Sequence, residues 1–240
     1  LGGVVLESEA NWQASAPGPD FQRRGTRLVY DDRRNLLRAS AGDLRTLARG
    51  FQAAPEISGL SVSRFYSLLD PQRIIRPRGS RSFRLDRRSQ VEVLVNGQLV
   101  RRLELDPVTF DLTDFPFAQG SNDVELTITD DTGLSETVDF DIFLDQAQLA
   151  EGLSEFGLYA GVLAPLGGRG PVYSDDLAFS GFYRRGINDR LTLGANAQAD
   201  PDGWMGGVEA VVATPIGSLG GLASASHSEG VGSGWASILT

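Results

Sequence analysis

The sequence has no cysteine, no lysine, only one histidine, and no apolar run long enough for a transmembrane helix. The absence of cysteine excludes a disulfide scaffold, a thiolate zinc site and a cysteine nucleophile. A single histidine, His227, excludes a metal site built from several histidines. A helix needs about 18 apolar residues to cross a bilayer, whereas barrel strands are short and only half apolar. A membrane location through strands therefore stays open.

The 240 residues have an apolar fraction of 41%, which is typical of a folded protein and fits one large domain or two smaller ones. The sequence begins at Leu1, with neither an initiator methionine nor a charged-then-apolar leader. Because the strand pattern continues to both ends, we expect an internal fragment of a longer protein.

Charge is unevenly distributed within the net charge of −9. Residues 1–82 carry +5, residues 83–146 carry −9 and residues 147–240 carry −5. This balance argues against nucleic acid as a partner. It also marks residues 83–146 as a surface of a different kind from the segments on either side.

Apolar and polar residues alternate with a period of two through residues 1–82 and 147–240, which predicts strands. The clearest case is residues 191–199, which separate a small apolar face from a neutral polar one: Leu191, Leu193, Ala195, Ala197 and Ala199 against Thr192, Asn196 and Gln198. Such charge-poor strands of about ten residues fit an outer-membrane barrel, with Leu193 toward lipid and Asn196 toward the lumen. We count nine or ten of them, four before residue 83 and five or six after residue 146. We expect closure of the barrel to need further strands.

The middle block, residues 83–146, predicts a small antiparallel β-sandwich. Asn96-Gly97 between two alternating runs is a strong hairpin signal, because both residues tolerate the positive φ of a type I′ turn. Residues 124–129 and 135–143 form a second pair around residues 130–133, after an expected break at residues 120–122. Prolines predict a similar break at residues 16–20 of the first block. The expected fold is all-β: part of a large antiparallel transmembrane β-barrel with an inserted β-sandwich.

Three segments of the middle block carry a family resemblance: residues 90–100 (QVEVLVNGQLV), 109–116 (TFDLTDFP) and 120–130 (GSNDVELTITD). Together they resemble the plug of fimbrial ushers, the outer-membrane pores of the chaperone–usher pathway. Residues 152–162 are similar to the segment that re-enters the barrel after the plug. Residues 41–44 and 49–51 are similar to the strand and loop that approach it. Residues 65–81 depart from the pattern, being longer and richer in arginine.

The resemblance implies three parts: barrel strands over residues 1–82, a plug domain over 83–146, and barrel strands over 147–240. It implies a non-enzymatic pore in the outer membrane of a Gram-negative bacterium, in which the plug moves aside so that pilus subunits cross and assemble. The implied partners are the lipid bilayer, pilus subunits in the pore, and periplasmic chaperone–subunit complexes. The family's domains that bind those complexes are not in this sequence.

The sequence offers no catalytic, cofactor-binding or metal residues. Asp130-Asp131-Thr132-Gly133 supplies at most one turn of a calcium loop, so a hairpin turn with solvated carboxylates is favoured. No pair of acids is distinguished as a glycosidase pair among the 31 present. His227 lies on the apolar side of its strand with no expected partner, which favours an ordinary strand position.

Two further groups have possible roles. Trp12, Trp204 and Trp235 lie near the ends of predicted strands, where interfacial girdle residues and ordinary sheet packing are both open. An arginine-rich cluster precedes and enters the middle block, and is either a solvated loop or an electrostatic seat for the plug. It consists of Arg73, Arg76, Arg78, Arg81, Arg84, Arg87 and Arg88.

Two other functions compete with the pore. A soluble or surface-exposed β-sandwich adhesin requires residues 154–240 to form a soluble sheet. A receptor with an N-terminal plug is disfavoured, because barrel-like strands precede the sandwich here.

Overall fold

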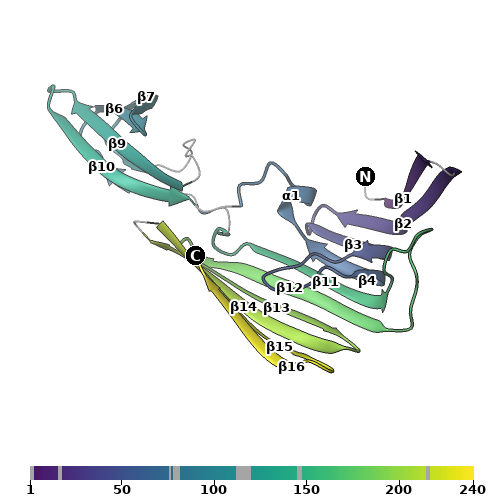
Figure 1. Cartoon of the computed structure of the whole chain (residues 1–240). Helices are drawn as coiled ribbons and strands as arrows, with labels where there is room; N and C mark the ends of the chain where they lie inside the picture. Colours follow the sequence, from purple (N-terminus) through teal and green to yellow (C-terminus); the bar gives the residue numbers. More distant parts are fainter. Residues whose placement is uncertain are drawn as a thin grey trace.

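The computed structural model describes residues 3–15, 18–75, 77, 82–111, 120–144, 148–214 and 217–240. Its main body is an antiparallel sheet of ten strands in the order β1-β2-β3-β4-β11-β12-β13-β14-β15-β16 (Figure 1). The strands are β1 (Val4–Ser15), β2 (Gly18–Asp32), β3 (Leu37–Arg45), β4 (Glu56–Arg64), β11 (Ser154–Leu163), β12 (Leu177–Asn188), β13 (Leu191–Asp200), β14 (Gly203–Thr214), β15 (Gly217–Ser228) and β16 (Gly232–Leu239).

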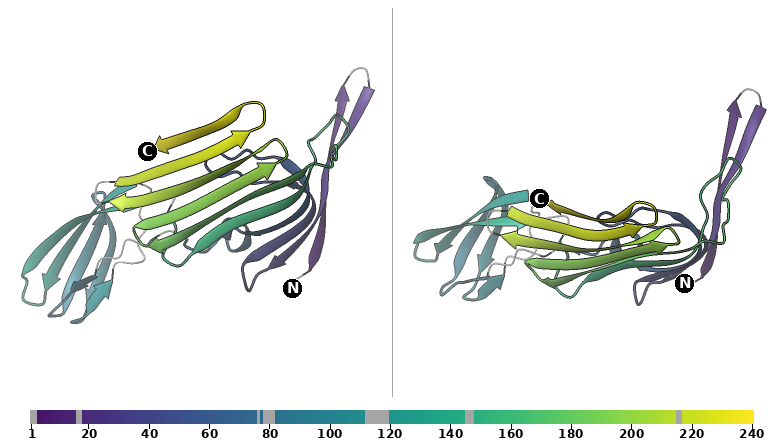
Figure 2. Two further views of the ribbon diagram at one scale, coloured as in Figure 1. Left: turned by 90° about the horizontal axis from the view of Figure 1, so that it is seen from below. Right: turned by 60° about the horizontal axis from the view of Figure 1, so that its bottom comes forward.

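Four of these strands precede the middle block and six follow it, which agrees with the predicted number of strands on each side. The sheet is strongly curved (Figure 2). Within the described residues, β1 and β16 are its two edges and do not pair with each other.

The break predicted at residues 16–20 is wrong in extent. The β2 strand already begins at Gly18, and Pro19 lies opposite Ala14 of β1. Before Arg27, in residues 18–26, β2 does not pair with β3 and has only β1 as a neighbour. Proline is tolerated in a strand at such edge positions. The break predicted at residues 120–122 is also wrong, because β9 begins at Gly120.

The middle block forms a small domain between β4 and β11. It has a four-stranded sheet, β10-β9-β6-β7, and a two-stranded sheet, β5-β8. Its strands are β5 (Ser82–Arg84), β6 (Ser89–Val95), β7 (Gln98–Leu105), β8 (Thr109–Asp111), β9 (Gly120–Asp130) and β10 (Ser135–Leu144). Positive φ at Asn96 and Gly97 confirms the predicted turn between β6 and β7.

The small domain has its own apolar core, formed by Leu85, Val91, Val93, Val95, Val124 and Leu126. Alternate residues of β6 are buried, as the period of two predicts. Figure 1 shows the domain beyond one end of the large sheet, where β4 ends and β11 begins. A single helical turn, α1 (Tyr66–Leu69), follows β4 on the way to it. Among the described residues, no helix has the length and apolarity needed to cross a bilayer.

The turn between β9 and β10 is organised by the side chain of Asp130. One carboxylate oxygen accepts hydrogen bonds from the Thr132 hydroxyl (2.6 Å), the Thr132 amide (2.9 Å) and the Leu134 amide (2.9 Å). These bonds, the one from the Thr132 hydroxyl foremost, lower the pKa of Asp130 below its ordinary value, and Arg87 adds to the effect. The hairpin-turn interpretation therefore accounts for this carboxylate without a metal.

We expect Asp130→Ala to lower amide protection at Thr132 and Leu134 several-fold, because both amides lose their acceptor. A depressed carboxyl pKa stabilises the folded turn above the unfolded value of about 4 and ceases to do so as pH falls through the folded value. Protection in the parent should therefore fall on acidification from pH 6 toward pH 3. Hydrogen exchange of the whole chain, corrected for intrinsic rates, measures both effects. Asp131→Ala is the matched control, and equal loss in both variants would contradict this account of the turn.

Candidate functional site: the two faces of the large sheet

The strand register separates the large sheet into an apolar face and a polar face. Residues directly opposite each other in an antiparallel sheet project to the same side, so one register row defines a face. The row that contains Leu6, Leu28, Leu60, Phe179 and Trp204 runs across eight strands. Every second residue above and below it belongs to the same face.

The apolar face is exposed along the whole sheet. Leu60 is 66% exposed and Val208 is 59% exposed, although both lie in the middle of the sheet. Its exposed members are Val4, Leu6, Leu28, Tyr30, Leu60, Val62, Leu158, Phe179, Tyr183, Leu193, Trp204, Val208, Val212, Leu219, Trp235 and Leu239. In β3, β4 and β11 to β16, charged side chains occur on this face only near strand ends. Exposed apolar patches of this extent are rare on monomeric soluble proteins and mark an interaction surface for another protein or for a membrane.

The opposite face is polar and carries the charges. It includes Ser61, Ser180, Arg184, Thr192 and Asn196, which are buried. The division predicted for residues 191–199 is confirmed, with Leu193 on the apolar face and Asn196 on the polar one.

The connection between β3 and β4, residues 46–55, lies across the polar face of β12 and β13. The amide of buried Gln52 donates to the carbonyl oxygens of Gly181 (3.0 Å) and Ala197 (2.8 Å). The Ala53 backbone amide donates to the side chain of Gln198 at 3.0 Å. The connection therefore lies on the inner side of the curved sheet.

This inserted connection changes the role of Asn196. A Cβ on Gly50 would lie 3.4 Å from the Asn196 amide nitrogen, and Asn196 is only 8% exposed. The expectation that Asn196 simply faces an open lumen is therefore incomplete, because the connection covers it. An arginine at this position would have to displace residues 46–55.

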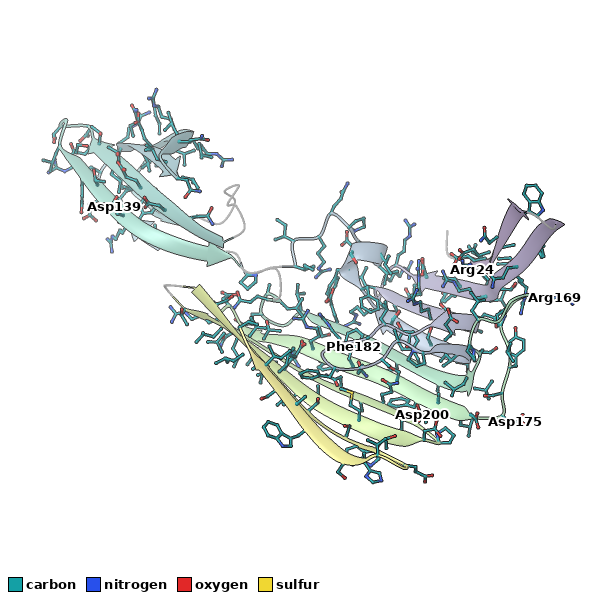
Figure 3. All side chains as sticks on the ribbon, in the orientation of Figure 1. Arg24, Asp139, Arg169, Asp175, Phe182 and Asp200 are labelled. Atoms are coloured by element: carbon teal, nitrogen blue, oxygen red, sulfur yellow. The ribbon has the colours of Figure 1, made fainter. Side chains whose placement is uncertain are left out.

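A buried ion cluster lies beneath the same connection. The Nε of Arg184 is 2.5 Å from a carboxylate oxygen of Glu209, and its Nη1 is 3.7 Å from one of Glu155. Arg49, in the connection, lies over the ring of Phe182, labelled in Figure 3, at 5.7 Å. Burial, and then the like charge of Arg184, lower the pKa of the Arg49 guanidinium. The cluster joins β11, β12 and β14 to the inserted connection.

We expect Arg184→Ala to destabilise the fold by about 3–5 kcal/mol, because it leaves two carboxylates buried without their cation. The neighbouring Arg185 is exposed on the apolar face, so Arg185→Ala should change the unfolding free energy by less than about 0.5 kcal/mol. Denaturant unfolding of both variants in lipid or detergent measures the difference. Equal losses would show that the ion cluster has no structural role.

Two long connections of the large sheet lie at the same end, together with the short turns at residues 201–202 and 229–231. Residues 46–55 and 164–176 are long connections at one end, which we call the loop end. At the other end, the small-domain end, β2 and β3 are joined by residues 33–36, and β12 and β13 by residues 189–190. The loop 164–176 reaches across to β2 and β3. The carbonyl of Gly167 accepts from Gln22 of β2 at 2.6 Å, and the hydroxyl of Tyr173 donates to Asp43 of β3 at 2.8 Å.

The three tryptophans lie toward the loop end, in β1, β14 and β16. Trp12 is 66%, Trp204 54% and Trp235 83% exposed. Ordinary packing within the sheet does not explain such exposure. The girdle interpretation stays a prediction that this placement favours.

The arginine cluster does not connect the small domain to the large sheet through the residues that the structure describes. Arg84 pairs with Asp86 (3.3 Å), Arg87 with Asp130 (3.9 Å) and Arg88 with Glu104 (3.5 Å), all within the small domain. Arg73 instead lies over the ring of Tyr66 at 5.1 Å. Arg76, Arg78 and Arg81 lie outside the described residues. Arg84, Arg87 and Arg88 therefore do not form an electrostatic seat between the small domain and the large sheet.

His227 has a partner, contrary to the prediction. Its Nδ1 lies 3.0 Å from the Ser233 hydroxyl on the neighbouring strand. Within the described part of the chain, no three metal-ligating side chains lie together.

The functional features that the sequence did not indicate are the insertion of Gln52 and the Arg184 ion cluster. Alternation could have placed Arg184 and Arg185 on opposite faces, but not the carboxylates that surround Arg184.

Comparison with known proteins identifies solved structures that share this architecture. No protein-family model matches the chain, and no curated protein matches it. Two solved structures of the translocation pore of the usher PapC match it with a TM-score of 0.52 each. One is 14% identical and covers 99% of this chain and 52% of its own, and the other is 17% identical and covers 100% and 50%.

A third match is an Escherichia coli P pilus tip assembly intermediate of PapC, PapD, PapK and PapG. It has a TM-score of 0.53 and 15% identity, and covers 98% of this chain and 29% of the matched one. The chain therefore has the fold of about half of the usher translocation pore, including both the large sheet and the inserted small domain.

Proposed function

We propose that the chain forms the middle of a fimbrial outer-membrane usher, a pore that translocates and assembles pilus subunits delivered by periplasmic chaperones. In this proposal residues 1–82 and 147–240 are barrel wall, and residues 83–146 are the plug domain that gates the channel. The observation that carries it is the insertion of a separately cored domain between β4 and β11, two strands that pair directly.

That insertion suits a movable stopper. The chain leaves the wall at the end of β4 and returns at the start of β11, beside the same point of the sheet. The two connecting segments are themselves joined, because the Ala150 amide donates to the Ile75 carbonyl at 2.8 Å. The two joined segments therefore form one hinge, about which the small domain can move while the strands of the wall keep their hydrogen bonds.

The two faces of the sheet support a membrane barrel. Backbone groups exposed to hydrocarbon cost several kcal/mol each, so strands cross membranes only in closed sheets with paired edges. Lipid would cover the apolar face, and water would fill the polar side, which holds Arg184, Glu155 and Glu209. A soluble adhesin leaves the apolar face unexplained.

The lengths of the connections suggest an orientation. Outer-membrane barrels have short periplasmic turns and longer extracellular loops. The loop end, with residues 46–55 and 164–176, would then face outward, and the small domain would be attached on the periplasmic side. Chaperone–subunit complexes arrive from that side, and we assign their recognition to parts of the protein outside this chain. The pore needs no catalytic residue, because it moves and assembles subunits without covalent chemistry of its own.

Pilus assembly in cells tests the proposal. The intact protein should restore surface pili, seen by electron microscopy, to a bacterium that lacks its usher but expresses the cognate chaperone and subunits. The protein should fractionate with the outer membrane and require detergent for extraction. Detergent-free solubility together with an absence of pili would favour the adhesin instead.

A further inference from the structure

Arginines gather at the small-domain end of the sheet, two of them on the apolar face and two in the adjoining turn. We call this group the basic rim, and it consists of Arg33, Arg34, Arg64 and Arg185. Arg33 and Arg34 are exposed in the turn between β2 and β3, Arg64 ends β4, and Arg185 lies near the end of β12. Four cations at the border of an otherwise apolar surface favour an anionic ligand. Because the surface beside them is apolar, that ligand should lie at the edge of an apolar phase.

The guanidinium of Arg64 is held in a fixed orientation. It donates to the Ser154 hydroxyl (3.2 Å), the Asn35 carbonyl (3.2 Å) and the Leu36 carbonyl (3.4 Å). It also lies over the ring of Phe156 at 5.4 Å. These partners are neutral, so the positive charge of Arg64 stays uncompensated while its position is set.

Arg185 lies next to this arrangement and is free to bind. It is directly opposite Ser154, the same residue that accepts from Arg64, and its side chain is exposed. Among the described residues no carboxylate forms an ion pair with Arg185. The nearby carboxylate of Asp32 is engaged within its own turn, where it accepts from the amides of Arg34 and Asn35 and from the Asn35 side chain.

Two aromatic side chains lie beside the arginines on the apolar face. Phe156 and Tyr183 lie opposite each other with ring centroids 6.4 Å apart and planes at 22°. Val62 and Leu158 follow two residues further along their strands, which is about 7 Å. Arg64 is directly opposite Phe156, and Arg185 follows Tyr183 by two residues toward the end of its strand. The aromatic rings therefore flank the cations, as amphipathic rings do at the headgroup level of a lipid leaflet.

We propose that the basic rim binds the phosphate of an anionic phospholipid headgroup in the periplasmic leaflet. This inference rests on the proposed function, because it requires the apolar face to lie in a bilayer. Arginine presents a fork of N–H donors that matches phosphate geometry, and arginines near a membrane surface favour anionic over zwitterionic lipid. Arg64 supplies the fixed cation, Arg185 the mobile one, and Tyr183 the surface for the glycerol region.

Lipid titration of the intact protein tests the inference. The protein is reconstituted in phosphatidylcholine nanodiscs, phosphatidylglycerol is titrated in at constant salt, and native mass spectrometry counts the retained lipids. Phosphatidylglycerol should be retained in preference to phosphatidylcholine, and Arg185→Gln should lower that preference about fivefold. Arg169→Gln, an exposed arginine at the loop end, is the matched control and should leave the preference unchanged.

Three outcomes would overturn the inference. These are no lipid preference in the parent, equal effects of the Arg185 and Arg169 variants, or displacement of the retained lipid by millimolar inorganic phosphate, which would indicate a site for the free anion. If the parent shows no lipid preference but inserts and conducts, only the lipid site fails. If it does not insert into bilayers at all, the proposed function fails with it.

Discussion

Deletion of residues 84–146 from the intact protein, with the ends joined by a short flexible linker, should leave a permanently open pore of high conductance. The wall survives the deletion because β4 and β11 pair directly over residues 57–64 and 156–163. A short linker suffices because Ile75 and Ala150 are already hydrogen-bonded to each other. Planar-bilayer recordings beside the parent, which should be closed most of the time, measure the change.

A matched control keeps the small domain and removes only its surface charges. Arg84, Arg87 and Arg88 pair with carboxylates of their own domain, and exposed pairs of this kind contribute little to stability. The triple replacement by Gln should therefore conduct like the parent. If the deletion variant conducts no more than the parent, the small domain is not the stopper and the adhesin regains support.

Val208→Arg should impair assembly of the barrel, costing about 2–4 kcal/mol, because it places a charge in the middle of the lipid-facing surface. Val208 is 59% exposed in the central part of β14. Ser224, on the adjacent strand, is on the polar face and half-buried, so Ser224→Arg should be tolerated. Heat-modifiable gel mobility measures the folded fraction. Equal damage by both substitutions would mean that the two faces have been assigned the wrong way round.

Ser224, and not Asn196, is the polar-face position compared with Val208, because residues 46–55 cover Asn196. Alternation placed Asn196 on the polar face correctly, but it could not show that residues 46–55 cover it. The hydrogen bonds that hold this connection join Gln52 to backbone carbonyls 129 and 145 residues away. Backbone acceptors are the same at every position of a chain, so no residue pattern indicates which of them a glutamine will reach.

Local rules of chain geometry were sufficient for most of the large sheet and the hairpins. A period of two predicted nine or ten strands, of which the structure has ten, and the correct faces of β13, and Asn96-Gly97 predicted the β6–β7 turn. The same local rules failed at Pro19 and Gly120, where the number of neighbouring strands decides whether a residue that usually breaks a strand is tolerated. The partners of Arg184 come from two other strands, β11 and β14, and depend on the order of the strands in the sheet.

The central claim, that the polar face lines a pore gated by the small domain, has one direct test. Because the sequence has no cysteine, a single one can be introduced at either of two adjacent positions of β15 in the protein that lacks residues 84–146. A bulky, water-soluble thiol reagent should then lower the conductance of the Ser224→Cys protein and leave that of the Ala223→Cys protein unchanged. Block of the Ala223→Cys protein alone, or of neither while both conduct, would contradict the account.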